Sequence, residues 1–437
     1  MRDKLRLELI LPKQKGAQRA KKTMVPHLGL ATVAALTPDD VEVTLTDEQI
    51  AAVDLQKHVD LVGISTLTTT APRAYEIADS FRARGVQVVL GGIHPSILPE
   101  EAGQHADAVV IGEAEGIWPS VIDDFKANRL KKFYHQQERP SSDCWPLPRR
   151  DLFAKSGYYL PGVVYISRGC PFSCSFCSGS SFFGPTYRTR PLDAIIQELE
   201  ELKDGRFLFF TDDNIVGKHK YAKALFEALI PYKKKWGAQA SITVARDEEL
   251  LRLAARSGCV ALFIGFESMS QDTLNSINKR GNKVKEYEEV VRRVHSHNIA
   301  VHGYFMFGFD EDYEGVFQRT VDFCRKLRLD TASFAVLVPF PGTPLHESLD
   351  NAGRIVTRDW AQYDRAIFEP KQMTMEVLDG RVEWCWREFY SLPSIWGRLR
   401  IKPTVRNLAF WFINLYVRHQ YMPRRANRLR ATSNTSV

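Results

Sequence analysis

The chain has 437 residues, of which 44% are hydrophobic and 25% charged, as is typical of a globular protein with room for two domains and an appendage. No apolar run reaches the roughly 18–20 residues of a bilayer-spanning helix, and the start of the chain lacks a signal peptide pattern, so we expect a cytoplasmic protein. The net charge of +7 is uneven, because nine Lys and Arg residues and no acidic residue follow Glu388.

The first part of the chain alternates short apolar runs with helical patterns. The runs are β-branched and apolar on both faces, as parallel strands covered by helices should be. A helical pattern such as APRAYEIADSFRARG separates them, with apolar positions at i, i+3 and i+4. We therefore predict an open, Rossmann-like α/β sheet. Its predicted strands are 6–11, 41–46, 61–66, 86–91 and 107–112.

Small or glycine-rich turns follow three of these strands. They are the stretches STLT from Ser65, GGIHP from Gly91 and GEAEG from Gly112. Ligands of open α/β sheets bind beyond the carboxyl ends of the strands, and small residues there let a large ligand approach the backbone. The three turns together predict a binding site for a large, flat or phosphate-bearing ligand.

A proline-rich, polar stretch separates this part from a second α/β series. Six βα units of about 30–40 residues predict a partial (βα)6 barrel, whose active site should lie at the carboxyl ends of its strands. The predicted strands are 163–167, 207–212, 239–244, 261–266, 301–308 and 333–338. The domain division that we expect is 1–135, a linker at 136–155, the barrel at 156–370 and a small helical region at 371–437.

The C-terminal region is aromatic-rich and basic. Its apolar run LAFWFINLYV is too short to span a membrane, and we expect it to pack against the barrel. An interfacial, lipid-facing helix is the alternative. The basic tail predicts either a solvated segment or peripheral contact with an acidic surface such as anionic lipid.

Seven cysteines are present, and three of them, Cys170, Cys174 and Cys177, lie just after the first barrel strand. The other four are scattered, so the pattern favours metal binding and free thiols over a disulfide framework. Thiolates spaced C-x3-C-x2-C can bind adjacent irons of a cubane cluster. A structural zinc site is the alternative, but it normally takes four ligands in two separated pairs. A second alternative is that three buried thiols lie close together by chance.

The stretch YISRGCPFSCSFCS resembles the cluster loop of radical S-adenosylmethionine enzymes, which share C-x3-C-x-aromatic-C. The resemblance covers nearly the whole chain. The stretches GGIHPSILPEEA and GEAEGIWP resemble the cobalamin-binding domain of the cobalamin-type subfamily, which includes hopanoid methylases and the anaerobic cyclase of chlorophyll synthesis. The resemblance implies a [4Fe-4S] cluster on Cys170, Cys174 and Cys177, with the fourth iron left open for S-adenosylmethionine.

The resemblance also implies further cofactor contacts. For S-adenosylmethionine they are Phe176 beside the cluster, Asp212 and Asp213 after the second barrel strand, Thr243 and Arg246 after the third, and Glu267 after the fourth. Asp212 or Asp213 could instead cap the following helix. For cobalamin the expected contacts are Ser65, Thr66, Leu67, Gly91, Gly92, His94, Gly112, Glu113 and Glu115.

One departure from the pattern concerns the cobalt ligand. Cobalamin proteins that replace the lower base carry an Asp-x-His-x-x-Gly loop after an early strand, and Gln49 stands here where that histidine would be. We expect no axial histidine from this loop. His94 could approach a corrin, or it could serve a structural role beside Pro95.

The sequence leaves three functional hypotheses. The first is a cobalamin-dependent radical methyltransferase acting on an unactivated carbon of a small molecule or lipid, in which one S-adenosylmethionine methylates the corrin and a second supplies the radical. The second is a radical cyclase, oxidase or rearrangement enzyme. The third is a non-catalytic cluster or corrin sensor. Either enzyme needs a reductant such as flavodoxin or ferredoxin, and we expect no nucleic acid partner.

Overall fold

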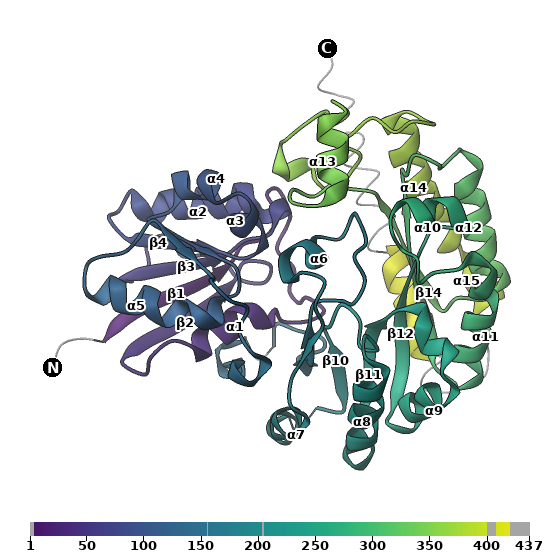
Figure 1. Cartoon of the computed structure of the whole chain (residues 1–437), viewed down its shortest axis with the longest axis horizontal. Coiled ribbons are helices and arrows are strands. Elements are labelled where there is room, and N and C mark those ends of the chain that lie inside the picture. Colours follow the sequence, from purple (N-terminus) through teal and green to yellow (C-terminus); the bar gives the residue numbers. More distant parts are fainter. Residues whose placement is uncertain (1–3, 155, 203–204, 400–407, 420–437) are drawn as a thin grey trace.

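The computed structural model describes residues 4–154, 156–202, 205–399 and 408–419. Two parallel sheets of six strands each lie side by side, with helices packed around them (Figure 1). The α/β class that the sequence predicts, a Rossmann-like sheet followed by a partial barrel and a helical C-terminal region, is confirmed.

The first sheet has the strand order β2-β1-β3-β4-β5-β6, all parallel. Its strands are β1 (Leu5–Leu11), β2 (Val41–Asp47), β3 (Leu61–Ser65), β4 (Gln87–Gly91), β5 (Ala108–Ile111) and β6 (Phe133–His135). Its helices are α1 (Leu28–Ala35), α2 (Ala71–Arg82), α3 (Ile93–Ile97), α4 (Pro99–His105) and α5 (Trp118–Lys126). The five predicted strands are all present, while β6 was not predicted because only three residues pair there.

Helices cover both faces of this sheet, because successive side chains along each strand point to opposite faces and both sets are apolar. Leu7 and Leu9 face one apolar core, which includes side chains of α1 and α5. Ile10 and Val62 face the other core, which includes side chains of α2. The carboxyl ends of the strands therefore remain as the place where this sheet can meet a ligand.

The second sheet has the order β14-β13-β12-β11-β10-β7, again all parallel. Its strands are β7 (Val163–Val164), β10 (Phe207–Phe210), β11 (Lys235–Ala240), β12 (Cys259–Glu267), β13 (Ala300–Phe307) and β14 (Thr331–Val336), and a small hairpin pairs β8 (Ser167–Arg168) with β9 (Arg188–Thr189). Its helices are α6 (Ser178–Phe183), α7 (Leu192–Glu201), α8 (His219–Leu229), α9 (Glu248–Arg256), α10 (Gln271–Ser276), α11 (Tyr287–Ser296), α12 (Gly315–Lys326) and α13 (Pro344–Asn351).

The prediction of a strand at 239–244 is wrong in its position. β11 begins at Lys235 and ends at Ala240, and a 3-10 helix at Ile242–Arg246 follows. Ile242 and Val244 are apolar because they are buried in this 3-10 helix, and their pattern was mistaken for that of a strand. The true strand is less obvious because Gly237 and two alanines, which favour strands weakly, make up half of it.

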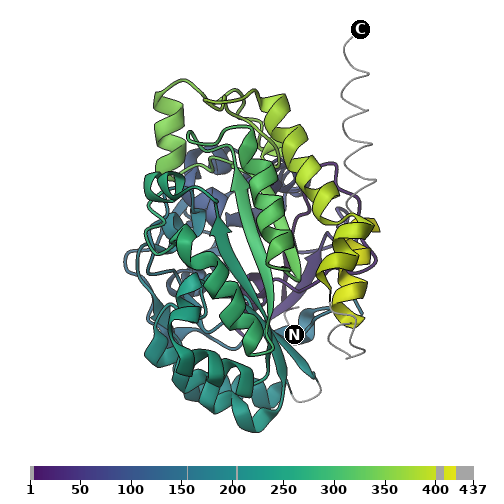
Figure 2. The same cartoon turned by 90° about the vertical axis from the view of Figure 1, so that its right-hand side faces the viewer.

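The first helix of the C-terminal region packs on the barrel, whereas the run LAFWFINLYV, for which we predicted this packing, contacts it through the buried Asn414 and leaves Leu408 and Phe412 exposed. α14 (Met375–Phe389) lies against β14 and α12, where Trp386 Nε1 donates a 2.7 Å hydrogen bond to Phe334 O. α15 (Leu392–Arg398) and a helix at 408–419 follow at the edge of the molecule (Figure 2). Most of the predicted basic tail lies outside the described residues. Within them, no helix is long and apolar enough to cross a membrane.

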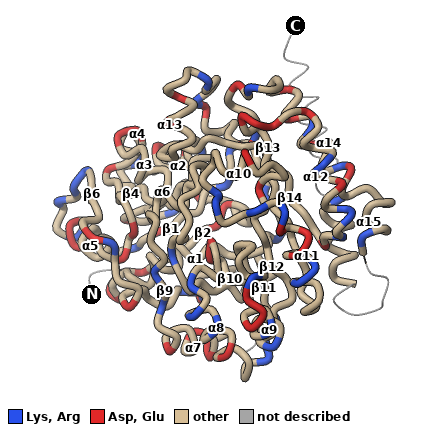
Figure 3. The backbone as a smooth tube through the Cα atoms, turned by 45° about the vertical axis from the view of Figure 1, so that its right-hand side comes forward, with Lys and Arg blue, Asp and Glu red and all other residues tan. Residues whose placement is uncertain are grey.

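Charged residues of both signs are interspersed over the outer helices, for example along α5, α9 and α12 (Figure 3). Surfaces of this kind are typical of solvated helices, and the mixed signs create no strong local electrostatic potential.

Candidate active site

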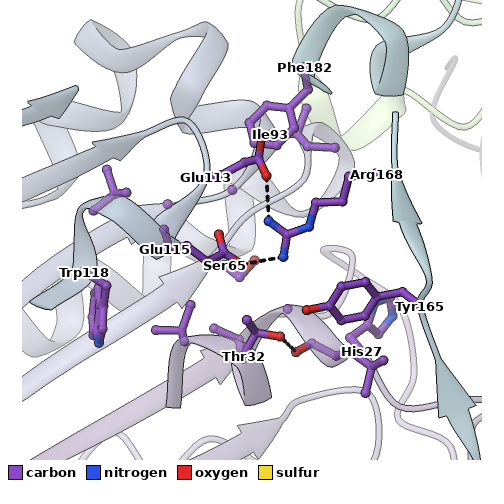
Figure 4. A pocket seen from close by; sticks show the side chains of 18 of the residues that line it. His27, Thr32, Ser65, Ile93, Glu113, Glu115, Trp118, Tyr165, Arg168 and Phe182 are labelled. Carbon is purple, nitrogen blue, oxygen red and sulfur yellow. Dashed lines mark hydrogen bonds and ion pairs between the residues drawn. The ribbon is translucent and has the colours of Figure 1, made fainter. Parts of the chain in front are cut away.

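A cavity of about 560 Å³ lies where the carboxyl ends of the two sheets face each other (Figure 4). From the first sheet it is lined by residues at or after the ends of β3, β4 and β5, namely Ser65, Gly91, Gly92, Gly112, Glu113 and Glu115. From the barrel side it is lined by Arg168 of the β8–β9 hairpin and by Thr211, Asp212 and Asp213 after β10. The cavity thus joins the predicted large-ligand site to the mouth of the barrel.

Backbone geometry explains the glycine after β4. Gly92 has φ of 103°, and a Cβ there would lie 2.8 Å from Thr66 O. The neighbouring turn is fixed by hydrogen bonds from Thr66 N to Gly91 O (2.8 Å) and from His94 N to Thr66 O (3.2 Å). Only glycine fits this conformation without strain, and the absence of a side chain lets a ligand approach the backbone closely.

Three of the predicted cobalamin contacts do not line the cavity. Thr66 is buried behind Gly92, and Leu67 is exposed outside the cavity. His94 is fully buried, and its ring nitrogens pair with Thr68 Oγ1 (3.3 Å), Tyr75 Oη (3.0 Å) and a Glu101 oxygen (3.2 Å). Glu101 also accepts from Trp360 Nε1, so this buried network ties the first sheet to the later part of the chain.

Arg168 links the two sheets at the cavity wall. Its guanidinium donates to Glu113 at 2.6 Å and to Glu115, and Arg188 donates to Glu113 at 2.5 Å. The Arg168 group also lies over the ring of Trp145, 4.4 Å from its centroid. Burial alone would lower the pKa of Arg168, but the two carboxylates raise it, so the charge is kept. This ion network was not predicted, because it joins residues more than 50 positions apart.

The cysteine loop is held against the barrel by its backbone. Ser175 N donates to Ile277 O at 3.1 Å, and Ser175 O accepts from Leu345 N at 3.0 Å. Cys177 is the N-cap of α6, and its Sγ accepts from Ser180 N at 3.4 Å. The loop is therefore anchored to the barrel between its outer cysteines.

The three thiols suit a cluster better than a single ion. They lie close enough for the charge of one to act on the pKa values of the others. Among the described residues, however, no group of three His, Cys, Asp or Glu side chains is arranged to hold one metal ion. A cubane cluster binds each cysteine to a different iron, so this looser trio fits it. Burial raises the pKa of the Cys174 thiol to about 11, a state that bound iron would reverse.

A buried ion pair stands beside the thiols. Lys279 Nζ lies 2.7 Å from Glu267 Oε1, and Glu267 has a left-handed backbone with φ of 66° at the end of β12. Burial would lower the pKa of Lys279, but the Glu267 carboxylate and the Cys174 thiol raise it more. Lys279 lies in an irregular segment with no strand or motif to mark it, so sequence reasoning missed it. Its charge can stabilise an anionic cluster or a substrate carboxylate.

The other predicted S-adenosylmethionine contacts lie in different settings. Asp213 lines the cavity near Cys177, with an oxygen 3.3 Å from where a Cβ on Gly179 would be. Asp212 accepts hydrogen bonds from Ile166 N (3.0 Å), Ser167 N (2.5 Å) and Ser167 Oγ (2.5 Å), and so positions the strand that leads into the cysteine loop. Burial raises the pKa of Asp212 to about 7.

Thr243 and Arg246 lie farther along the barrel rim. Thr243 Oγ1 lies 2.7 Å from Ser241 Oγ and 3.3 Å from His219 Nε2. Arg246 is partly exposed, and it donates to Glu286 and to Gly281 O, each at 2.7 Å. A role for Arg246 in binding a carboxylate would require it to leave Glu286.

A second cavity, of about 350 Å³, adjoins the cysteine loop through Phe176. Its walls are mostly apolar and aromatic, from Met306, Phe334, Phe340 and Trp386. Tyr363 also lines it, is 1% exposed, and has a hydroxyl that meets no hydrogen-bond partner among the described residues. A buried hydroxyl without a protein partner costs free energy.

Comparisons with known proteins agree with this geometry. A B12 binding domain model matches residues 21–122, and a radical SAM superfamily model matches residues 164–324. Bacteriochlorophyllide d C-12(1)-methyltransferase of Chlorobaculum tepidum is 35% identical over 401 residues, which cover 89% of this chain and 87% of the relative. Bacteriochlorophyllide d C-8(2)-methyltransferase of the same organism is 32% identical over 413 residues, covering 88% and 91%.

A solved structure supports the fold. The cobalamin-dependent S-adenosylmethionine radical enzyme OxsB, with aqua-cobalamin and S-adenosylmethionine bound, superposes with a TM-score of 0.70 at 14% identity, covering 95% of this chain and 71% of OxsB. The matches favour methylation over the other radical reactions and over a sensor. The cofactors are a [4Fe-4S] cluster, S-adenosylmethionine and cobalamin. The chain therefore belongs to the radical S-adenosylmethionine superfamily, among the cobalamin-dependent methyltransferases that carry a B12-binding domain.

Proposed function

We propose that this enzyme methylates a carbon on the rim of a flat, conjugated tetrapyrrole. The observation that carries the proposal is the second cavity, whose aromatic walls adjoin the cysteine loop through Phe176. Aromatic side chains bind conjugated rings through stacked and edge-on contacts. The cavity need hold only one edge of the macrocycle, because methylation changes a single substituent there.

The relatives support this substrate class. The two bacteriochlorophyllide d methyltransferases match 89% and 88% of the chain. They differ in the position that they methylate, so a shared scaffold accommodates different substituents of one kind of ring. A substrate of this kind also carries polar groups, and the free Tyr363 hydroxyl is a suitable partner for one of them.

We further propose how the chain holds its cofactors. Cys170, Cys174 and Cys177 would bind three irons of the cluster, and Phe176, Asp213 and Glu267 would contact S-adenosylmethionine, with Lys279 balancing charge. Asp212 would act through the cysteine loop that it positions. The roles of Thr243 and Arg246 stay predictions. When bound, the cofactors supply the methyl group and the hydrogen-abstracting radical; the protein orients them and excludes water.

The cobalamin would occupy the larger cavity. Ser65, Gly91, Gly92 and Gly112 offer it backbone and small side chains, and Glu113 and Glu115 are held by Arg168 at its edge. The first cavity thus receives the methyl carrier and the second receives the methyl acceptor, with the cluster loop contributing to the barrel mouth near both.

An anaerobic assay tests the reaction. Reconstituted enzyme with cobalamin, S-adenosylmethionine and a reducing system is incubated with a chlorophyllide or bacteriochlorophyllide, and products are followed by mass spectrometry. We expect a product heavier by one methylene group, together with 5′-deoxyadenosine and S-adenosylhomocysteine. Formation of 5′-deoxyadenosine without a methylated pigment would contradict the proposed substrate.

Tyr363→Phe tests the cavity. The variant removes only the unpartnered hydroxyl, so iron content and cobalamin binding should stay unchanged. Loss of one buried hydrogen bond to substrate should raise KM for the pigment about 5–10-fold, in line with roughly 1–1.5 kcal/mol. Tyr232→Phe, on the outer surface in the 3-10 helix after α8, is the matched control. An unchanged KM in both variants would place the substrate elsewhere.

The chain also needs a reductant, and we propose a small one-electron donor such as flavodoxin or ferredoxin for that role. Replacing a chemical reductant with either protein should sustain turnover. A failure of both would argue for another class of donor.

Peripheral membrane contact is a further proposal for the C-terminal region. In the helix at 408–419, Phe412 is 70% exposed and Leu408 is 62% exposed, whereas Asn414 is buried and hydrogen-bonds to Arg398 and to Asp330 O. Trp396 of α15 is also exposed and lies edge-on to Trp411. A helix that turns apolar residues outward beside basic sequence suits an anionic membrane interface.

Vesicle sedimentation tests this contact. The full chain should bind vesicles of phosphatidylglycerol and phosphatidylcholine more than vesicles of phosphatidylcholine alone. Phe412→Ser should weaken the binding, and Val356→Ser, at an exposed apolar residue elsewhere, should leave it unchanged. Equal binding by both variants would remove the helix from the contact.

A further inference from the structure

We propose that His27 supplies an imidazole ligand to one axial position of the cobalt. This inference rests on the use of cobalamin by the enzyme and not on the identity of its substrate. His27 is the only histidine among the described residues that line the larger cavity, and it stands directly before α1, where the chain returns from β1 (Figure 4). Imidazole nitrogen is a common ligand of cobalt and similar metals.

The ring of His27 is free to bind a metal. It makes no hydrogen bond or ion pair with another described residue, and as the N-cap of α1 it leaves the helix end without a side-chain cap. Some of the other described histidines are held by partners: His295 pairs with Asp330, and His302 pairs with Thr331 and Ser333. His27 differs from the other described histidines because it lines the larger cavity.

The backbone that carries His27 is well supported. Pro26 before it is buried and lines the same cavity, and Leu28 after it packs beside Trp145 and Tyr165. Thr32 Oγ1 donates a 3.0 Å hydrogen bond to Leu28 O within the first turns of α1. A ligand on the end of a packed helix is positioned before the metal arrives, which reduces the entropic cost of binding.

A carboxylate is available to orient the ring. Asp47 ends β2 next to the end of β1, with Leu11 as its partner in the register. Its oxygens accept from Gln49 N at 2.9 Å and from Tyr158 Oη at 3.0 Å, and its charge acts on His27. Metal-binding histidines are commonly oriented by a carboxylate at the second ring nitrogen. The sequence lacks a histidine at Gln49, and the charge of Asp47 instead acts on His27.

The other candidate, His94, does not serve. Both of its ring nitrogens already have protein partners, and it does not line the cavity. Using it as a ligand would require breaking the buried network with Tyr75, Glu101 and Trp360. The geometry therefore favours His27 over the histidine that the sequence alone suggested.

Electron paramagnetic resonance of the cob(II)alamin-loaded enzyme tests the assignment. One axial nitrogen splits each cobalt line into a triplet when it is ¹⁴N and into a doublet when it is ¹⁵N. With uniformly ¹⁵N-labelled protein and unlabelled cobalamin, we expect doublets from a protein nitrogen. The dimethylbenzimidazole base of the cofactor would instead keep the triplets, and the absence of splitting would mean no nitrogen ligand; either result overturns the proposal.

His27→Gln identifies the residue. We expect the variant to lose the doublet while it keeps its iron content and its far-ultraviolet circular dichroism. His58→Gln, at an exposed histidine in the segment between β2 and β3, should keep the doublet and is the matched control. Persistence of the doublet in His27→Gln would assign the nitrogen to another residue. Neither measurement involves the pigment, so a wrong substrate proposal would not affect the outcome.

Discussion

At the larger cavity the first sheet presents mainly glycine, serine and backbone from the ends of β3, β4 and β5, while the second presents charged side chains. Gly92 and Gly112 both have positive φ, and neither has room for a side chain. On the barrel side, Arg168 and the Lys279–Glu267 pair bring buried charge to the cavity wall and the cysteine loop. One half presents backbone and small side chains to the cavity, and the other presents buried charge.

This difference suggests a division of work, in which the first sheet binds a cofactor through its shape and the barrel side supplies the charged groups. A backbone-built surface can hold a large macrocycle without presenting reactive groups to it. A site that cleaves a sulfonium needs fixed charges, because the cluster and its ligand change charge during turnover. If the two halves divide the work in this way, substitutions in one should leave the function of the other intact.

The largest effect should come from Cys174→Ser, which tests whether the halves can be separated. Loss of one thiolate should remove most of the iron and bring S-adenosylmethionine cleavage to background, while cobalamin affinity stays at the wild-type value. Iron analysis, 5′-deoxyadenosine yield and cobalamin titration measure the three properties. Cys144→Ser, at an exposed cysteine, should change none of them. Loss of cobalamin binding in Cys174→Ser would show that the halves are coupled.

Arg168→Met tests the link between the halves. The side chains of Glu113 and Glu115 are 4% and 3% exposed, so the variant leaves buried carboxylate without its main partner. Breaking a buried pair in this way costs about 3–5 kcal/mol. Urea unfolding should show the loss, whereas Arg292→Met, whose partner Glu289 is exposed, should cost less than about 1 kcal/mol. Equal losses would mean that the network contributes no more than a surface ion pair.

The charged half should also carry a pH dependence through Asp212. Its pKa is about 7 in the folded state against 3.8 for an unperturbed carboxyl, so its contribution to stability is full below pH 3.8 and is lost as pH rises through 7. At about 1.4 kcal/mol per unit, the difference approaches roughly 4 kcal/mol. Asp212→Asn keeps an acceptor for Ile166 N and Ser167 N but cannot ionise.

We therefore expect the melting temperature of the wild type, relative to Asp212→Asn, to fall between pH 4 and pH 7. Comparing the two proteins at each pH cancels the titration of all other groups. A constant difference across this range would show that Asp212 is ionised throughout, and that its hydrogen bonds outweigh the cost of burying its charge.

The same contrast explains what the sequence could and could not predict. The turns at Ser65, Gly91 and Gly112 were found from local pattern, because strand, turn and glycine are neighbours in the chain. The cysteine spacing is equally local. Lys279 and the Arg168 network could not be found, because their partners come from distant segments. His94 was misleading as a candidate cobalamin contact for the same reason. It pairs with Glu101, and Glu101 accepts a hydrogen bond from Trp360, which lies more than 250 residues farther along the chain.

The smallest effect should come from Gly92→Ala, which tests the shape-built half alone. The added Cβ would stand 2.8 Å from Thr66 O on a backbone with φ of 103°, and such strain costs about 1–3 kcal/mol. We expect cobalamin affinity to fall roughly 5–150-fold if the turn relaxes into the cavity. Gly116→Ala is the matched control, since it has no positive φ and no atom within 4 Å of the new Cβ. Iron content and reductive cleavage of S-adenosylmethionine should survive in Gly92→Ala, and their loss would mean that the backbone at this edge also supports the cluster.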